Sequence, residues 1–290
     1  MSLLHKFSYV RAESLAHALD TLATHGDEIQ VVAGGTVIVA LIRHRMIEPK
    51  VLVGLEGIPG VADIRVSGAG LTIGALATHR AVSRSEDVRR VAPLLARACA
   101  KVASPAIRSM GTLGGNVCFG EPASDPGPAL LAQGARLRIH GPRGERTVDI
   151  TDHYLGYYET SLGMGEVLES VEVDPTAPGS RSTYLKWTPR AREDKPLVGL
   201  AVVLEMDRDV CTRARLAVGG VADRPTLLSA ASALLVGRRL SEDVIADASE
   251  AAADEVEPIE DVQASAGFRR DMLRLWTSRT LQQLAAGEEK

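Results

Sequence analysis

Two glycine-rich segments of this chain carry residue types suited to binding a phosphate group. Residues 33–38 read Ala-Gly-Gly-Thr-Val-Ile, and residues 110–116 read Met-Gly-Thr-Leu-Gly-Gly-Asn. Because glycine has no Cβ, its backbone amide can approach a diphosphate closely, and a Gly-Gly pair can turn successive amides toward one anion. Two such segments could hold one dinucleotide from both sides.

The first segment lies between a predicted strand and a predicted helix. Residues 28–33 are typical of a strand, and residues 37–46 of a helix that ends before Pro49, with Thr36 as its N-cap. The start of such a helix offers free amides and the positive end of its dipole to a phosphate. An ordinary strand-to-helix turn explains the segment equally well. Neither segment is G-x-G-x-x-G or ends in Gly-Lys-Ser/Thr, which disfavours a Rossmann or P-loop site.

The second segment is the more specific signal. It follows a helix predicted over residues 88–102 and leads toward Ser124 and Asp125. Asn116, Ser124 and Asp125 could form hydrogen bonds to sugar hydroxyls or to an adenine. Alternatively, Ser124 and Asp125 simply begin a helix ahead of Pro126.

Composition excludes several classes of protein. The chain has 290 residues, of which 45% are hydrophobic. Its net charge is −4 and its 33 basic residues form no block, so no nucleic-acid partner is expected. The apolar run at 37–42 ends at Arg43, so no membrane span is expected, and no secretory signal is evident. A cytoplasmic location is therefore predicted.

The cysteines and histidines do not suggest a metal site. Cys99, Cys118 and Cys211 are widely separated, and three cysteines cannot hold a four-cysteine cluster. Cys118 is close to Asn116 and could face a cofactor, although a small buried filler fits it better. His44 and His79 are interpreted as surface or capping residues.

Four motifs occur in an order and spacing that resemble a known family. They are Ala-Gly-Gly-Thr at 33–36, Thr-Ile-Gly-Ala-Leu-Ala-Thr-His at 72–79, the segment 107–116, and Pro-Ala-Ser-Asp at 122–125. Together they resemble the FAD-binding medium subunit of molybdenum hydroxylases, the xanthine dehydrogenase and aerobic carbon monoxide dehydrogenase family. The similarity extends over essentially the whole chain.

The resemblance implies an α+β fold with two domains. A two-lobed PCMH-type FAD-binding domain would cover residues 1–176, with lobes of about 1–60 and 61–176. A C-terminal α/β domain of the CO dehydrogenase flavoprotein type, built from antiparallel strands and helices, would cover 181–290.

Residue patterns predict elements that agree with this organisation. Residues 174–180, with two prolines, are the best candidate for a linker. The predicted elements are a helix at 14–25 with a leucine face, a strand at 51–53, hairpins spanning 64–73, 136–148 and 200–218, and helices near 226–235, 241–256 and 267–285.

The resemblance also implies a set of FAD contacts and no catalytic residue. The two pyrophosphate loops would be Ala33, Gly34, Gly35, Thr36, Val37 and Ile38 in the first segment and Gly111, Thr112, Leu113, Gly114, Gly115 and Asn116 in the second. Ser124 and Asp125 would contact the ribose or the adenosine. Ile38 and Leu168 would be aliphatic contacts to the isoalloxazine, and Lys186 would be the lysine near the flavin. A cation near the flavin would stabilise the negative charge of its reduced form. From residue type alone, Ile38 and Leu168 would be core residues, and Lys186 an exposed strand lysine.

One departure from the family pattern affects the flavin face. The carbon monoxide dehydrogenase branch usually has an aromatic residue after an aspartate, whereas Lys195 follows Asp194 here. Tyr184, Trp187 or an aliphatic residue could take the place of that ring. The electron acceptor, whether NAD⁺, quinone or O₂, is therefore left open.

The resemblance implies an electron-transfer subunit that binds FAD. A large subunit with the molybdenum cofactor and a small subunit with [2Fe–2S] centres would be its partners, in a heterotrimer or a dimer of heterotrimers, and electrons would leave to an external acceptor. The alternatives are a stand-alone flavin-dependent oxidoreductase of the same fold and a scaffold that has lost its cofactor. The intact glycine segments argue against the scaffold.

The tail from about Arg181 is expected to serve assembly and closure over the flavin. Arg269, Arg270 and Arg274 could give its last helix a polar face that docks the iron–sulfur subunit. Alternatively, these arginines merely solvate a terminal helix.

Overall fold

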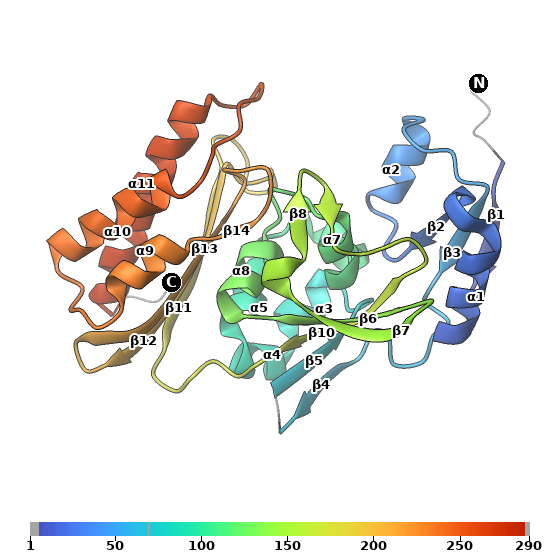
Figure 1. Cartoon of the computed structure of the whole chain (residues 1–290), viewed down its shortest axis with the longest axis horizontal. Coiled ribbons are helices and arrows are strands. Elements are labelled where there is room, and N and C mark those ends of the chain that lie inside the picture. The colour runs from blue at the N-terminus through green and yellow to red at the C-terminus, as the bar shows by residue number, and fades with distance from the viewer. Residues whose placement is uncertain (1–5, 69, 288–290) are drawn as a thin grey trace.

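A computed structural model describes residues 6–68 and 70–287. The chain forms three regions along its long axis: an N-terminal lobe at the right of Figure 1, a central region, and a C-terminal region at the left. Each region has its own sheet. None of the described helices is both long and apolar enough to cross a bilayer.

The N-terminal lobe is a small parallel α/β unit with strand order β1-β3-β2. Ser14 caps its first helix by accepting a hydrogen bond from the His17 amide, and Ala18 and Leu22 of that helix are buried against the sheet. The predicted helix with a leucine face is therefore confirmed. The elements are β1 (Ser8–Arg11), α1 (Leu15–His25), η1 (Gly26–Glu28), β2 (Ile29–Val32), α2 (Ile38–Arg43) and β3 (Val51–Gly54).

The central region is a five-stranded antiparallel sheet, in the order β4-β5-β10-β6-β7, packed against short helices. The predicted hairpins are confirmed as β4/β5 and β6/β7. The elements are β4 (Ile64–Ser67), β5 (Gly70–Gly74), α3 (His79–Arg84), α4 (Glu86–Val91), α5 (Pro93–Lys101), α6 (Pro105–Met110), α7 (Leu113–Phe119), α8 (Pro126–Gln133), β6 (Arg136–Gly141), β7 (Gly144–Asp149), η2 (Ile150–Asp152), β8 (Tyr154–Gly156), β9 (Glu159–Thr160) and β10 (Val167–Val173).

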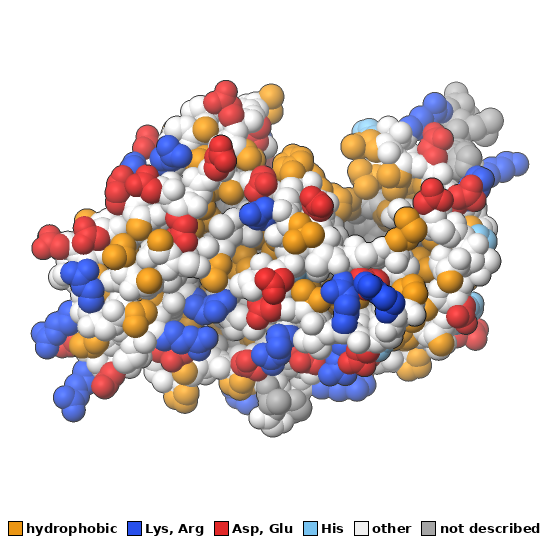
Figure 2. All heavy atoms as spheres, viewed as in Figure 1, with side chains coloured by type: hydrophobic (Ala, Val, Ile, Leu, Met, Phe, Trp, Pro, Cys, Tyr) orange, Lys and Arg blue, Asp and Glu red, His pale blue; other side chains and the backbone are white. Residues whose placement is uncertain are grey.

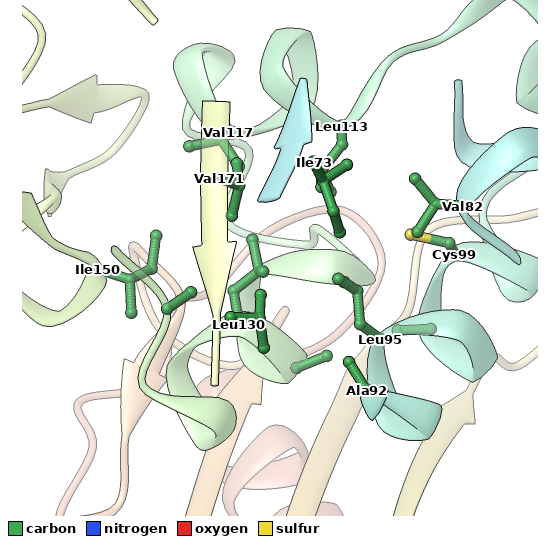
Figure 3. Packing of buried hydrophobic residues seen from close by; sticks show 14 of the residues in the cluster. Ile73, Val82, Ala92, Leu95, Cys99, Leu113, Val117, Leu130, Ile150 and Val171 are labelled. Atoms are coloured by element: carbon green, nitrogen blue, oxygen red, sulfur yellow. The ribbon is translucent and has the colours of Figure 1, made fainter. Parts of the chain in front are cut away.

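Small and medium-sized aliphatic residues form the core of this region. Ile73 of β5 and Val171 of β10 project from the sheet toward Leu113, Leu95 and Leu130 of the covering helices, and all five are almost wholly buried (Figure 3). This core fixes the start of α7, and with it the second glycine-rich segment.

Two predicted helices differ from the structure. The helix expected over 88–102 is broken, because Pro93 has no amide hydrogen and disfavours helical geometry at Ala92, so α4 ends at Val91. Thr36 is not a helix cap: α2 begins at Ile38 and has Val37 at its N-cap position, without a side-chain hydrogen bond.

The C-terminal region is an antiparallel sheet in the order β11-β12-β13-β14. Helices α9, α10 and α11 lie along its outer side, and α5 and α8 contact the other face (Figure 1). Residues 174–180 connect β10 to β11 without helix or strand, and the hairpin predicted at 200–218 is confirmed as β12/β13. The elements are β11 (Arg181–Trp187), β12 (Val198–Asp207), β13 (Val210–Gly219), β14 (Thr226–Leu227), α9 (Ser229–Leu235), α10 (Glu242–Asp254) and α11 (Ala266–Ala285).

The three arginines of α11 do not form one exposed face. Arg269 is only 3% exposed, and its guanidinium donates hydrogen bonds to the Gly220 carbonyl and, at 2.7 Å, to Asp261. The interpretation of Arg269 as a docking residue is therefore wrong. Arg270 is exposed, and Arg274 forms ion pairs on the helix surface.

Candidate cofactor site

A cavity of about 870 Å³ lies where the N-terminal lobe meets the rest of the chain. Figure 2 shows a hollow there, with hydrophobic side chains on both sides. Every predicted site residue lines this cavity except Leu113, which is fully buried in the central core. The lining thus includes Ala33, Gly34, Gly35, Thr36, Val37, Ile38, Gly111, Thr112, Gly114, Gly115, Asn116, Ser124, Asp125, Leu168 and Lys186.

The two glycine-rich segments are in direct backbone contact. A Cβ on Gly34 would lie 1.9 Å from the carbonyl oxygen of Met110, closer than any real side chain approaches. Gly34 is therefore needed for this contact between the segments. They form one continuous wall of the cavity, although they are about 75 residues apart in the sequence.

The first segment has unused backbone donors. Within the described part of the chain, the amides of residues 34–38 have no acceptor. Gly35 has a φ of +69°, which L side chains rarely adopt, and a Cβ there would meet nothing closer than 3.7 Å. Successive free amides beside open space are what an anion such as a diphosphate requires.

The second segment differs from the expectation of a phosphate cradle. The amides of residues 113–116 already donate hydrogen bonds of 2.9–3.0 Å to the carbonyls of Ala77 and Ala75 and to the Oγ1 and carbonyl of Thr112. A Cβ on Gly114 would lie 2.6 Å from the Cβ of Ala75. These residues start α7 close against β5, so their role here is mainly packing that shapes the wall.

Three polar residues predicted to contact the cofactor form one hydrogen-bonded group. Ser124 donates to Asn116 Oδ1 at 2.6 Å and accepts from the amide of Gly127 at 3.0 Å. The amide nitrogen of Asn116, which carries two donor hydrogens, has no partner among the described residues. Asn116 therefore keeps donors for a ligand, whereas Ser124 is occupied within the chain.

Asp125 and Lys186 form a buried ion pair at the cavity wall. Lys186 Nζ lies 2.9 Å from Asp125 Oδ2, and Tyr184 donates to Asp125 Oδ1 at 2.8 Å. Burial raises the pKa of Asp125 to about 6, although Lys186 and Tyr184 lower it. Lys186 also donates to the Lys101 carbonyl at 2.9 Å, so one of its three ammonium hydrogens is left for a ligand. Lys186 is buried, not an exposed strand lysine.

His79 is a cavity residue that the sequence did not reveal. It is 3% exposed, and its Nδ1 atom is buried without a hydrogen-bond partner among the described residues. Burial, with a smaller contribution from Arg108, lowers the pKa of His79 to about 4, so the ring is neutral near pH 7. The surface or capping interpretation is therefore wrong for His79. It begins helix α3, and no periodicity of that short helix marks its burial.

The cavity wall also contains Phe119, Glu121 and Lys195. Lys195 pairs with Glu121, and Tyr158 donates to Glu121 at 2.9 Å. Neither candidate for the missing aromatic ring lines the cavity: Tyr184 is buried in the central core, and Trp187 packs against Phe268 and Trp276.

Comparison with known proteins identifies the family. Residues 5–176 match the family model described as "FAD binding domain in molybdopterin dehydrogenase", and residues 183–284 match "CO dehydrogenase flavoprotein C-terminal domain". The chain belongs to the molybdopterin dehydrogenase FAD-binding family. The cofactor of the chain is FAD, and the chain is a subunit of an oxidoreductase.

Relatives of this FAD-binding family match along nearly their whole length. The chain is 33% identical to subunit alpha of the 6-hydroxypseudooxynicotine dehydrogenase complex of Paenarthrobacter nicotinovorans, covering 95% of this chain and 93% of the relative. It is 31% identical to the carbon monoxide dehydrogenase medium chain of Afipia carboxidovorans, covering 97% of each. The crystal structure of quinoline 2-oxidoreductase from Pseudomonas putida 86 superposes with a TM-score of 0.92, at 31% identity and 99% coverage of both chains. The expected two-part α+β fold is thus confirmed.

Proposed function

We propose that this chain is the electron-transfer flavoprotein subunit of a molybdenum-containing hydroxylase. In this proposal, a large partner subunit with the molybdenum cofactor oxidises the substrate. The chain then passes electrons from [2Fe–2S] centres on a small partner subunit to an external acceptor. The observation that carries the proposal is the near full-length match to medium chains and subunits of dehydrogenase complexes.

The cavity supports this proposal because its groups suit FAD. We infer that the free amides of residues 34–38 bind the diphosphate and that Asn116 donates to a polar part of the cofactor. Ile38 offers apolar surface to the flavin ring, and the remaining ammonium hydrogen of Lys186 offers a donor. Leu168 also lines the cavity, although it is only 3% exposed and packs in the central core. Bound FAD supplies the redox chemistry, while the protein binds and orients it.

The domain organisation follows from the same proposal. The FAD-binding domain comprises residues 1–176 in two lobes, with the cofactor between them, and residues 181–290 form the C-terminal domain. The C-terminal domain closes the cavity through Lys186, which its first strand places beside Asp125. Assembly as a heterotrimer or its dimer, and the cytoplasmic location, stay predictions.

Purification of the chain with its partners tests the proposal. A tagged chain, co-expressed with the subunits encoded beside its gene, is expected to yield a complex that contains FAD, iron and molybdenum in constant ratio. When the iron–sulfur centres are reduced with a limiting amount of reductant, the visible absorbance of the flavin should then decrease. A chain that retains FAD but purifies without iron and molybdenum would instead support the stand-alone flavin oxidoreductase.

A further inference from the structure

Phe119 places an aromatic side chain in the cavity wall. Among the described residues, it is the one Phe, Tyr or Trp side chain that lines the cavity. It is the last residue of α7, and the chain turns away after it because Gly120 adopts a left-handed conformation with φ +63°. Phe119 is half-buried, so part of its ring is not covered by protein.

The ring of Phe119 is supported from the side by the β8–β9 hairpin. Tyr158, at the turn of that hairpin, lies with its ring centroid 4.8 Å from that of Phe119, at an interplanar angle of 56°. A Cβ on Gly120 would come within 2.8 Å of Thr160 Cγ2, so the hairpin lies directly against the end of α7. Tilted aromatic pairs at this separation attract each other, which limits the orientations of the Phe119 ring.

Tyr158 is itself held in place by polar contacts. Its hydroxyl donates to Glu121 at 2.9 Å, and Glu121 also pairs with Lys195 and accepts from the amide of Ala123 at 3.3 Å. Tyr158 has a φ of +56°, a conformation that non-glycine residues adopt only where the surroundings impose it. The support of Phe119 is therefore built from α7, the hairpin and the loop that carries Lys195.

The geometry points to Phe119 as the aromatic contact for the flavin ring of FAD. A supported, partly uncovered aromatic ring in a cavity is suited to a planar apolar ligand group. FAD contains two such groups, and the flavin is favoured because Phe119 is linked through Tyr158 and Glu121 to Lys195, which belongs to the same C-terminal region as Lys186, the lysine that the proposed function places near the flavin. This inference rests on the proposed FAD site.

Substitution of Phe119 tests the inference. In Phe119→Leu, FAD is expected to bind roughly tenfold more weakly, which corresponds to the loss of one aromatic contact. The visible circular dichroism bands of the bound flavin should also change, whereas affinity for ADP, measured by competition, should stay as in the wild type. Phe119→Tyr, which keeps the ring, should restore the wild-type values.

Phe268→Leu is the matched control, because it makes the same substitution on α11 at a residue outside the cavity wall. It should leave FAD affinity and the flavin bands unchanged. Equal losses of FAD and ADP affinity in Phe119→Leu would place the adenine at this ring and overturn the inference, as would unchanged binding and unchanged bands. Absence of FAD from the wild-type chain would overturn the FAD site itself, a separate outcome.

Discussion

Lys186 Nζ lies 2.9 Å from Asp125 Oδ2, and the two side chains are only 5% and 6% exposed. This pair joins β11 of the C-terminal sheet to the start of α8 in the central region. Each charge is costly to bury alone, so the contact makes closure of the cavity wall dependent on both partners.

We expect Lys186→Met to destabilise the protein by about 3–5 kcal/mol at pH 7.5, because it leaves the Asp125 carboxylate buried without its cation. The loss should be smaller at pH 5. Lys186 lowers the pKa of Asp125, so its removal raises that pKa further above 6, and stability is then lost as the pH rises through it.

Urea unfolding at the two pH values measures this effect. Lys50→Met is the control, because Lys50 and its partner Glu28 are 62% and 48% exposed, and loss of this surface pair should cost about 1 kcal/mol or less. Equal decreases in the free energy of unfolding for the two substitutions would contradict a larger contribution of the buried Lys186–Asp125 pair to stability.

Gly35→Val is expected to abolish retention of FAD while leaving most of the fold intact. The left-handed backbone at Gly35 makes a β-branched residue cost about 1–3 kcal/mol, and the new side chain would project beside the free amides. FAD content after gel filtration and the melting temperature measure the two effects. Full flavin occupancy in the variant would remove the first segment from the site.

Gly114→Val does not test FAD binding cleanly, although Gly114 lies in a glycine-rich segment predicted to contact the cofactor. Its Cβ would meet the backbone of Ala75, so loss of FAD would accompany a packing defect. Gly267→Ala is a better comparison for Gly35→Val: Gly267 has open space around it in the first turn of α11, and alanine should leave both stability and FAD content intact or raise stability slightly.

His79 should make stability depend on pH. Its pKa is about 4 in the folded protein and about 6.5 when unfolded, so acid favours the unfolded chain, which binds the proton. As the pH falls from about 6.5 to about 4, the free energy of unfolding of the wild type should decrease by about 3 kcal/mol relative to that of His79→Gln. Above pH 7, the free energies of unfolding of the two proteins should change with pH in the same way. Parallel stability curves for the two proteins between pH 4 and 6.5 would contradict the buried, neutral histidine.

The docking role of α11 can be tested at the arginines that the structure leaves at the surface. Arg270→Glu with Arg274→Glu should weaken co-purification with the iron–sulfur subunit if this face docks it. The melting temperature should fall modestly, because Arg274→Glu replaces two surface ion pairs with like-charge contacts to Glu250 and Asp271, and Arg274→Ala is the control for that loss. Arg269→Met should instead lower stability by about 2–4 kcal/mol, since it unpairs Asp261 and the Gly220 carbonyl. A complex that survives both charge reversals would exclude this face.

The sequence by itself determined the local features of this protein. Alternating apolar residues and turn residues predicted the β4/β5, β6/β7 and β12/β13 hairpins, because strand patterning and turn chemistry act over neighbouring residues. The order of its glycine motifs also indicated the family and FAD. Nearly all residues predicted on that basis lie around one cavity.

Only the tertiary structure decided how those residues are used. Which glycine segment keeps free amides depends on contacts with Met110, Ala75 and Ala77, none of which is a sequence neighbour of the segment it meets. The burial of His79 and Arg269 likewise results from packing between distant elements. A residue's type states what bonds it can form, but long-range packing determines which partners are present and which donors remain for the cofactor.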